Sequence, residues 1–196
     1  MILPIVAYGD PVLRKRGEVI DKNYNGLKEL IADMFETMYE AKGVGLAAPQ
    51  VGKSIRLFVV DASPFAEDKD DDGKIVSENA SLKGFKKIFI NAKITNEEGD
   101  EWEFNEGCLS IPKIREDVER HDSIEIEYYD ENFKKHKETY DGLAARIILH
   151  EFDHIEGKLF VDRISPLRKR LLKGKLADIS RGKVDVAYKM KFPVLK

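Results

Sequence analysis

The strongest constraint on the fold is a change of periodicity near residue 142. Over residues 123–142, "SIEIEYYDENFKKHKETYDG", apolar and polar side chains alternate on both sides of "DEN". A period of two puts successive side chains on opposite faces of a strand, which indicates a β-hairpin with one buried face. The next stretch, "GLAARIILHEFDHIEG" (142–157), instead carries apolar residues at helical spacing and ends at Gly157. The chain therefore turns from a hairpin into a helix.

The next predicted elements are a second helix and two more strands. Residues 25–42 repeat apolar side chains at helical spacing and stop at Gly43, as an amphipathic helix does. The stretches "SIRLFVVDA" (54–62) and "KIFINAKIT" (87–95) are rich in β-branched and aromatic residues, which favours strands. Helices and strands do not alternate regularly. We therefore predict an α+β fold in which mostly antiparallel sheets pack around a central metal-binding helix carrying "HEFDH" (150–154).

Length and composition fit one globular domain. The chain has 196 residues, 42% of them hydrophobic and 35% charged, and no low-complexity linker divides it. Residues 1–196 are expected to form a single domain with a polar insertion at 62–86. No apolar run approaches the length of a membrane span, and the N-terminal residues lack the basic start and apolar core of a secretory signal. We expect a cytoplasmic protein with neither a membrane nor a DNA partner.

The C-terminal segment, residues 165–196, is a basic appendage. It carries ten Lys or Arg and two Asp in a chain whose net charge is −3. The pattern predicts a basic helix around "LRKRLLKGKLADI" (167–179), followed by a strand, "KVDVAYKMKF" (183–192). A basic helix is usually a solvated surface, and the alternative is an electrostatic contact with the phosphates of a nucleic acid.

Candidate catalytic residues are concentrated in "HEFDH". Residues four apart on a helix lie on one face, so His150 and His154 can bind one ion through two imidazole nitrogens. Glu151 then lies close enough to handle the proton of an activated water. A charged stretch on a helix is more often plain exposed surface, but the apolar residues that lead into His150 count against that interpretation.

A catalytic site of this kind needs a third protein ligand, and the single cysteine is the candidate. Cys108 lies in "EGCLSIP" (106–112), where Gly107 lets a backbone approach closely; a buried structural cysteine is the usual alternative. We favour a ligand over a nucleophile, because a thiolate that binds a metal is lost to attack. Gln50 ends "GVGLAAPQ" (43–50), which follows a helix and so does not fit a dinucleotide loop. Its amide is suited to stabilising an oxyanion.

The three stretches together closely resemble one family, the peptide deformylases, which remove the N-formyl group from the initiator methionine of new bacterial polypeptides. The family's motifs are a GxGLAAxQ loop, an EGCLS strand and an HExDH helix, and all three occur here in that order. The resemblance extends from "YGDPVLR" (8–14) to "GKLFVDRISPL" (157–167). It implies a hydrolase that releases formate from formyl-Met nascent peptides.

The resemblance also implies roles for individual residues. Cys108 and both histidines of "HEFDH" would hold the metal, and Glu151 would be the general acid and base. The amide of Gln50 and the backbone N–H of Leu109 would stabilise the oxyanion. The substrate peptide would bind along the backbone around Val44, Gly45 and Gly107, together with Glu106. Phe104, Leu143 and Ile147 would form the methionine pocket. Arg115 would lie on the substrate side of the site.

The identity of the metal and of further partners is less constrained by the residues. One thiolate and two imidazoles accept Fe²⁺, Zn²⁺, Ni²⁺ or Co²⁺, and the resemblance implies Fe²⁺ as the physiological ion, in an oxygen-sensitive site. In some members of the family a C-terminal helix docks on the ribosome. By that resemblance, transient contact of "LRKRLLKGK" (167–175) with RNA phosphates is a hypothesis for this chain.

Three other interpretations compete for parts of the sequence. An HExxH endopeptidase would cleave inside peptides, although the cysteine and the loop ending in Gln50 count against it. A metal-stabilised module that binds RNA would normally use a fourth protein ligand. The stretch "DKDDDGKIVSEN" (68–79) imitates a calcium-binding EF-hand loop, but its twelfth position is Asn79, so a solvated insertion is favoured over a Ca²⁺ site.

Overall fold

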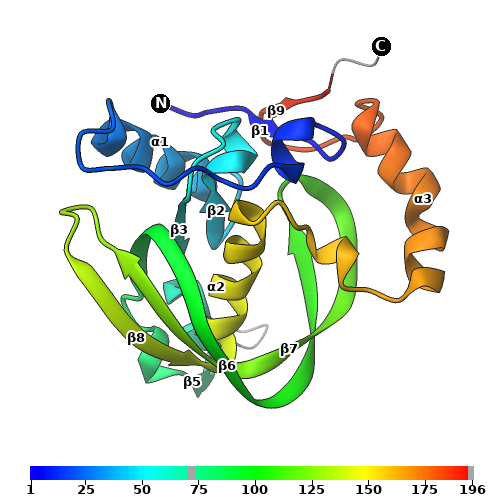
Figure 1. Ribbon diagram of the computed structural model, residues 1–196. Helices are drawn as coiled ribbons and strands as arrows, with labels where there is room; N and C mark the ends of the chain where they lie inside the picture. The colour runs from blue at the N-terminus through cyan, green and yellow to red at the C-terminus, as the bar shows by residue number, and fades with distance from the viewer. Residues whose placement is uncertain (70–73, 194–196) are drawn as a thin grey trace.

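The computed structural model describes residues 1–69 and 74–193 (Figure 1). Helices combine there with mostly antiparallel strands, which confirms the predicted α+β class. Residues 70–73 of the stretch that imitates a calcium-binding loop (68–79) lie outside the described part of the chain. The α-helices are α1 (Leu27–Glu40), α2 (Gly142–Ile155) and α3 (Pro166–Ser180). The strands are β1 (Ile5–Val6), β2 (Gly45–Ala47), β3 (Leu57–Asp61), β4 (Glu67–Lys69), β5 (Ile75–Glu78), β6 (Lys86–Cys108), β7 (Ile111–Tyr129), β8 (Lys135–Asp141) and β9 (Met190–Lys191).

The main sheet has the order β2-β3-β6-β7-β8, and every neighbouring pair in it is antiparallel. Strands β6 and β7 form a long hairpin whose tight turn is Leu109 and Ser110. Register shifts interrupt their pairing at several points, and such irregularities bend strands. The hairpin therefore curves around α2 instead of lying flat (Figure 1).

Helix α2, which the change of periodicity near residue 142 predicts as a helix, occupies the concave side of this sheet (Figure 1). Its apolar residues pack with side chains of β3, β6 and β7 in one buried cluster. Ile148 is fully buried, and Leu149 is 2% exposed. Burying each such side chain contributes roughly 2 kcal/mol relative to leaving it in water. This packing fixes the helix that carries "HEFDH", so its polar residues face a defined part of the sheet.

Helix α1 covers the other face of β2 and β3 with its apolar stripe. Met34 and Met38 are fully buried and belong to a cluster that also contains Leu46 and Leu57. The stretch "GVGLAAPQ" (43–50) leaves this helix, enters β2 and then makes the 3₁₀ turn η2 (Ala48–Val51). The motif therefore contains a short strand of the main sheet.

The polar insertion at 62–86 is attached to the core at both ends. It begins with the 3₁₀ turn η3 (Ser63–Phe65), forms the β4–β5 hairpin, and returns through η4 (Ala80–Leu82). Leu82 is 1% exposed and lies in the same buried cluster as α2. The insertion is therefore polar outside while its buried residues join the main core.

The two ends of the described chain meet in a separate small sheet. β1 and β9 pair in parallel, with Ile5 opposite Met190. Only Met190–Lys191 of the predicted strand 183–192 is a strand, so that expectation is wrong for most of the segment. The alternation there arises because a single extended stretch runs over the protein surface with some side chains turned inward.

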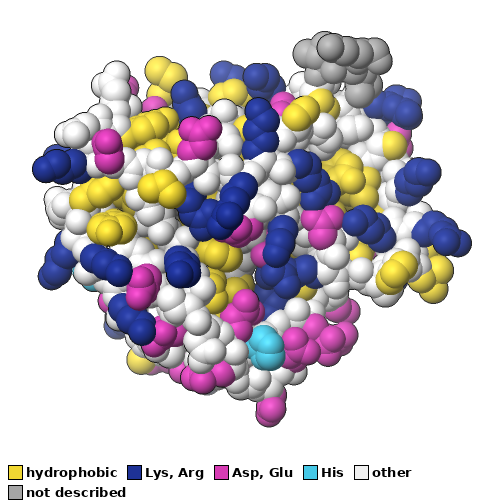
Figure 2. All heavy atoms as spheres, viewed as in Figure 1, with side chains coloured by type: hydrophobic (Ala, Val, Ile, Leu, Met, Phe, Trp, Pro, Cys, Tyr) yellow, Lys and Arg dark blue, Asp and Glu magenta, His cyan; other side chains and the backbone are white. Residues whose placement is uncertain are grey.

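Helix α3 lies at the outside of the molecule, where Figure 2 displays Lys and Arg side chains around its position in Figure 1. Ser165 caps it by accepting a hydrogen bond from the N–H of Arg168 at 3.3 Å, and Pro166 occupies the first turn. Leu172 and Leu176 are buried against the body. Across residues 1–69 and 74–193, no helix is long and apolar enough to cross a membrane.

Candidate metal centre

Three candidate ligands meet where the end of β6 crosses α2. Cys108 is the last residue of β6, and His150 and His154 lie one helical turn apart on α2. Their ligand atoms all lie within 4.8 Å of one another, and Cys108 Sγ is 3.3 Å from His154 Nε2. One thiolate and two imidazoles fit a transition-metal ion and leave a fourth position for water or substrate. The residues predicted from two separate motifs therefore form one donor set.

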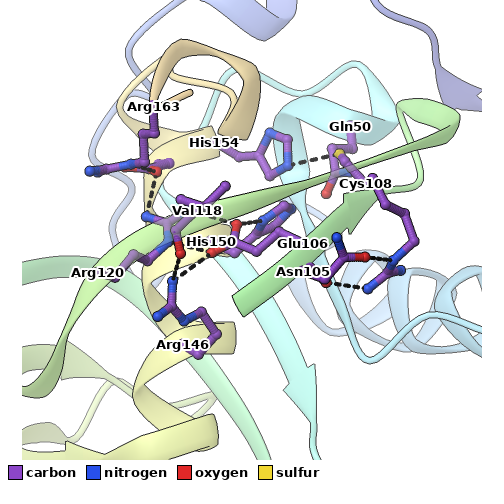
Figure 3. Close-up of polar contacts among 12 residues, drawn as sticks. Gln50, Asn105, Glu106, Cys108, Val118, Arg120, Arg146, His150, His154 and Arg163 are labelled. Carbon is purple, nitrogen blue, oxygen red and sulfur yellow. Dashed lines mark hydrogen bonds and ion pairs between the residues drawn. The ribbon is translucent and has the colours of Figure 1, made fainter. Parts of the chain in front are cut away.

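A buried carboxylate orients one of these ligands. Glu106 accepts a hydrogen bond from His150 Nδ1 at 2.8 Å, which leaves His150 Nε2 as the nitrogen available to a metal (Figure 3). Arg120 donates to the same carboxylate from Nε at 2.6 Å and from Nη2 at 2.9 Å. Burial alone raises the pKa of Glu106, but these donors hold it well below its usual value. The carboxylate therefore stays charged.

The charge of Glu106 is part of a larger buried network. Arg120 Nη1 also donates to Asp153 at 2.8 Å, and Arg163 donates to Asp153 from two nitrogens, at 2.6 and 2.7 Å. Arg146, one turn before His150 on α2, donates a hydrogen bond from Nη1 to Glu106 Oε1 at 3.1 Å. Figure 3 shows these side chains converging behind His150. Sequence reasoning missed this network; its one local signal is the Asp within "HEFDH", and the arginines lie in stretches without a motif.

Glu151 is buried beside the candidate ligands. It is 5% exposed, and its Oε2 atom has no hydrogen-bond partner among the described residues. Burial raises the pKa of Glu151 to about 7, so the group can both accept and donate a proton near neutral pH. Burial and the neighbouring His150 lower the pKa of His154 to about 3, which keeps that imidazole neutral, as a ligand must be.

A glycine makes room for that carboxylate. An added Cβ at Gly45 would overlap Oε1, Cδ and Cγ of Glu151, because β2 passes directly beside the side chain. Gly45 is fully surrounded and does not adopt the left-handed backbone conformation. The glycine is therefore required by close approach of a side chain to the backbone.

The two predicted oxyanion donors lie next to the same ligands. Gln50 is 1% exposed, and its Oε1 accepts a hydrogen bond from the N–H of Ala47 at 2.8 Å, which fixes the orientation of the amide. Its Nε2 then points to Cys108 Sγ at 3.4 Å and to Ser110 Oγ at 3.3 Å. Leu109 follows Cys108 in the hairpin turn, so its N–H belongs to the adjacent peptide unit.

A cleft of about 660 Å³ opens over this centre and brings together the predicted substrate-binding residues. Glu106 also lines the cleft, although its side chain contacts His150 and two arginines and the residue is 4% exposed. Arg115 lies at the rim, where its Nε donates to Asn105 Oδ1 at 2.8 Å. The predicted substrate-binding and oxyanion residues that line the cleft are Val44, Gly45, Gln50, Phe104, Glu106, Gly107, Leu109, Arg115, Leu143 and Ile147.

Several segments line the cleft without having been predicted to do so, among them the insertion at 62–86 and the C-terminal segment. Phe65, from the insertion at 62–86, is 42% exposed at its edge. Residues 185–188 of the C-terminal segment form part of the wall. A partly exposed aromatic side chain inside a polar insertion is the signal that would have pointed to Phe65. The C-terminal segment offers none, because the contact depends on how the chain returns from α3.

Comparisons with known proteins agree on one family. The family model described as polypeptide deformylase matches residues 2–170. A peptide deformylase of Flavobacterium psychrophilum is 63% identical over 191 residues, covering 97% of each chain, and one of Christiangramia forsetii is 59% identical over 196 residues, covering 100% of this chain and 98% of that protein. The crystal structure of a peptide deformylase from Legionella pneumophila matches with a TM-score of 0.75 at 37% identity, over 93% of this chain and 98% of that one.

The α+β fold and a site where two histidines and a cysteine could bind one metal ion beside a buried glutamate fit the class of metal-dependent hydrolases. On the match of the family model and the identities over nearly the whole length, the chain belongs to the peptide deformylase family. It is an enzyme of protein biosynthesis that removes the N-formyl group from nascent polypeptides. Of the three functions considered from the sequence, this is the one that the comparisons support.

Proposed function

We propose that Cys108, His150 and His154 together bind one divalent metal ion at the centre of the fold, and that Glu151 is the general acid and base of deformylation. The observation that carries this proposal is the convergence of the three ligand atoms within 4.8 Å beside a buried carboxylate. A carboxylate whose pKa is raised to about 7 by burial is suited to exchanging protons at neutral pH.

The proposed reaction is hydrolysis of the formyl amide. Cys108, His150 and His154 would hold a divalent ion, which would supply a Lewis acid to activate water and to polarise the formyl oxygen. Glu151 accepts a proton from the attacking water and delivers one to the amine that leaves. Gln50 Nε2 and the N–H of Leu109 donate hydrogen bonds to the formyl oxygen as negative charge grows on it. The products are formate and a peptide with a free N-terminal amine.

The cleft is proposed to hold the substrate as an extended chain. The methionine side chain packs against Phe104, Leu143 and Ile147, since an unbranched and polarizable side chain suits an adaptable apolar pocket. The backbone on either side, around Gly45 in β2 and Gly107 in β6, offers hydrogen-bonding groups to an extended peptide. Arg115 at the rim is assigned to the part of the substrate beyond methionine.

The proposed physiological metal is Fe²⁺, with Zn²⁺, Ni²⁺ or Co²⁺ as replacements in purified protein. A thiolate and two neutral imidazoles bind all four ions, and a redox-active ion beside a thiolate predicts loss of activity in air. The test is elemental analysis of protein purified anaerobically and in air, with activity measured for each. Stable activity in air with iron as the bound metal would contradict the oxygen-sensitive site.

The whole chain is proposed to act as one cytoplasmic catalytic domain, residues 1–196, that makes a transient contact with the ribosome through α3. Leu167 and Leu171 are 65% and 63% exposed on that helix, beside a series of basic side chains. Arg168 pairs with Glu116, whereas Arg170 and Lys173 make no ion pair within residues 1–69 and 74–193. Co-sedimentation with ribosomes over a salt series tests this, and absent or salt-insensitive binding would overturn it.

The decisive experiment on the reaction uses anaerobically purified, metal-loaded protein and a formyl-Met tripeptide. Wild-type protein is expected to release formate, and Glu151→Gln, which keeps the size of the side chain, is expected to lose about 100-fold or more in kcat. Glu29→Gln, on the surface of α1, serves as the matched control. Stoichiometric metal without formate release by the wild type would overturn the proposal.

A further inference from the structure

After α3, the C-terminal segment runs back to the catalytic site. Residues 185–188 line the substrate cleft, and Tyr188 packs half-buried against the cluster that contains α1 and β2. The next residues enter β9, where Ile5 N donates to Lys189 O at 2.8 Å and Ala7 N donates to Lys191 O at 2.9 Å. Backbone hydrogen bonds to β1 therefore hold this return segment in place.

The hydroxyl of Tyr188 reaches the turn that follows the cysteine. It donates a hydrogen bond to the carbonyl oxygen of Leu109 at 2.7 Å. The next carbonyl in the turn, that of Ser110, accepts from the N–H of Tyr8 at 2.8 Å, and Ser110 Oγ contacts Gln50 Nε2 at 3.3 Å. The Leu109–Ser110 turn is therefore held from three directions.

Two of these three contacts come from the small terminal sheet. Tyr8 lies just beyond β1, and Tyr188 lies just before β9. Because β1 and β9 pair in register, the two donors approach the turn as one unit. We call Tyr8 and Tyr188, with the strands that carry them, the terminal clamp. The main sheet alone supplies neither donor.

We propose that Tyr188 is a positioning residue for deformylation, acting through the peptide units of Leu109. The inference rests on the proposed role of the Leu109 N–H as an oxyanion donor. The N–H and the C=O of Leu109 flank one Cα, so a hydrogen bond to the C=O restricts the dihedral angles that aim the N–H. Oxyanion donors act only within a narrow range of distance to the developing charge, and small displacements reduce the rate strongly.

A purely structural role predicts a different result from the same contacts. If the ring of Tyr188 only fills space beside Leu109, removal of its hydroxyl changes neither kcat nor KM. If the return segment only forms a wall of the cleft, its disturbance raises KM and leaves kcat unchanged. Positioning of an oxyanion donor instead lowers kcat, because the donor acts on charge that exists only in the transition state.

The test compares Tyr188→Phe with Tyr129→Phe in steady-state formate release at equal metal occupancy. Tyr129 is also half-buried beside the same cluster, and its hydroxyl makes no hydrogen bond among the described residues. Tyr188→Phe is expected to lower kcat about 3- to 10-fold with KM within about twofold of wild type, while Tyr129→Phe changes neither. Thermal unfolding of both variants verifies that they are folded at the assay temperature.

Each other outcome overturns the inference. An unchanged kcat in Tyr188→Phe, a change in KM alone, or an equal loss in Tyr129→Phe removes the positioning role. A loss that disappears once metal occupancy is equalised assigns Tyr188 to metal retention instead. Formate release by the wild type, measured in the same assay, reports on the proposed function separately, so an inactive wild type is distinguishable from an unaffected Tyr188→Phe.

Discussion

Glu106 links the metal ligands to the rest of the buried charge. Its carboxylate binds His150 on one side and Arg120 and Arg146 on the other, at 3% side-chain exposure. A buried charge with three charged or polar partners is stable only while every partner remains. The family resemblance assigns Glu106 to peptide binding, but its side chain is instead engaged by His150 and the two arginines.

Replacement of Glu106 by Gln tests that role. The amide keeps the shape but leaves Arg146 without its negative partner and Arg120 with Asp153 alone, so the free energy of unfolding is expected to fall by about 3 kcal/mol. The weaker acceptor at His150 Nδ1 is expected to reduce metal affinity about 10- to 100-fold. Denaturant unfolding and competition with a chelator measure the two effects. Glu103→Gln, exposed on the same strand, is the control, and an equal result for both variants would contradict the prediction.

Gly45 offers a test at Glu151, the proposed proton-transfer group. In Gly45→Ala the new methyl group overlaps the Glu151 carboxylate and must displace it, so kcat is expected to fall about tenfold or more while the protein stays folded. Gly174→Ala is the matched control, because nothing lies within 4 Å of its added Cβ. Alanine in the interior of α3 is expected to leave kcat unchanged and to raise stability by about 0.5–1 kcal/mol. Full activity of Gly45→Ala would refute the placement of Glu151.

At the scale of elements, the sequence predicts what local periodicity controls. Helices α1 and α2 match the predicted ranges within a few residues, because each has a buried apolar stripe. Strand β6 runs to Cys108, well beyond the predicted 87–95, although its residues from about 97 are mostly exposed. That part is held largely by pairing with β7, and only Trp102 and Phe104 alternate there with polar residues, which is too short a pattern to define the whole strand.

The β7–β8 pair contains a polar cluster that makes a prediction about pH. Burial opposes the charge of Glu138, but hydrogen bonds from Tyr128, Tyr140 and Lys87 lower its pKa to about 2. A carboxylate with a depressed folded-state pKa contributes stability above its ordinary value of 4.5, and the contribution is lost as pH falls from there toward 2. Glu138→Gln is therefore expected to be less stable than wild type at pH 7, with the difference shrinking below about pH 4.

Denaturant unfolding of wild type and Glu138→Gln at several pH values measures this difference. Glu131→Gln, at an exposed position in the β7–β8 connection, is the control and is expected to follow the wild type throughout. A difference between wild type and Glu138→Gln that stays constant from pH 7 to pH 3 would mean that the hydrogen bonds do not depend on the charge of Glu138.

At the scale of the whole molecule, the site assembles from segments that only the fold brings together. The ligands and Glu151 are predictable because each lies in a local motif with its own chemistry. The network of Arg120, Asp153 and Arg163 is not, because a buried arginine on a strand has the same local sequence pattern as an exposed one. The terminal clamp is even harder to predict from the sequence, because it depends on pairing between the two ends of the described chain.

Because the proposed donor set joins β6 to α2, metal binding there is expected to contribute to the stability of the whole fold. A ligand that binds only the folded state stabilises it by about 2.7 kcal/mol at 100 times its Kd, which for a chain of this length shifts Tm by roughly 5–10 °C. Chelation is expected to abolish formate release and to lower Tm by that amount, with both restored on adding the metal back. Cys108→Ser and His154→Ala, which each lack one ligand, are expected to have a low Tm that chelator barely changes. A site that has lost a thiolate or an imidazole cannot supply the same binding free energy. If chelator lowers the Tm of these variants as much as that of the wild type, the ion therefore binds elsewhere in the protein.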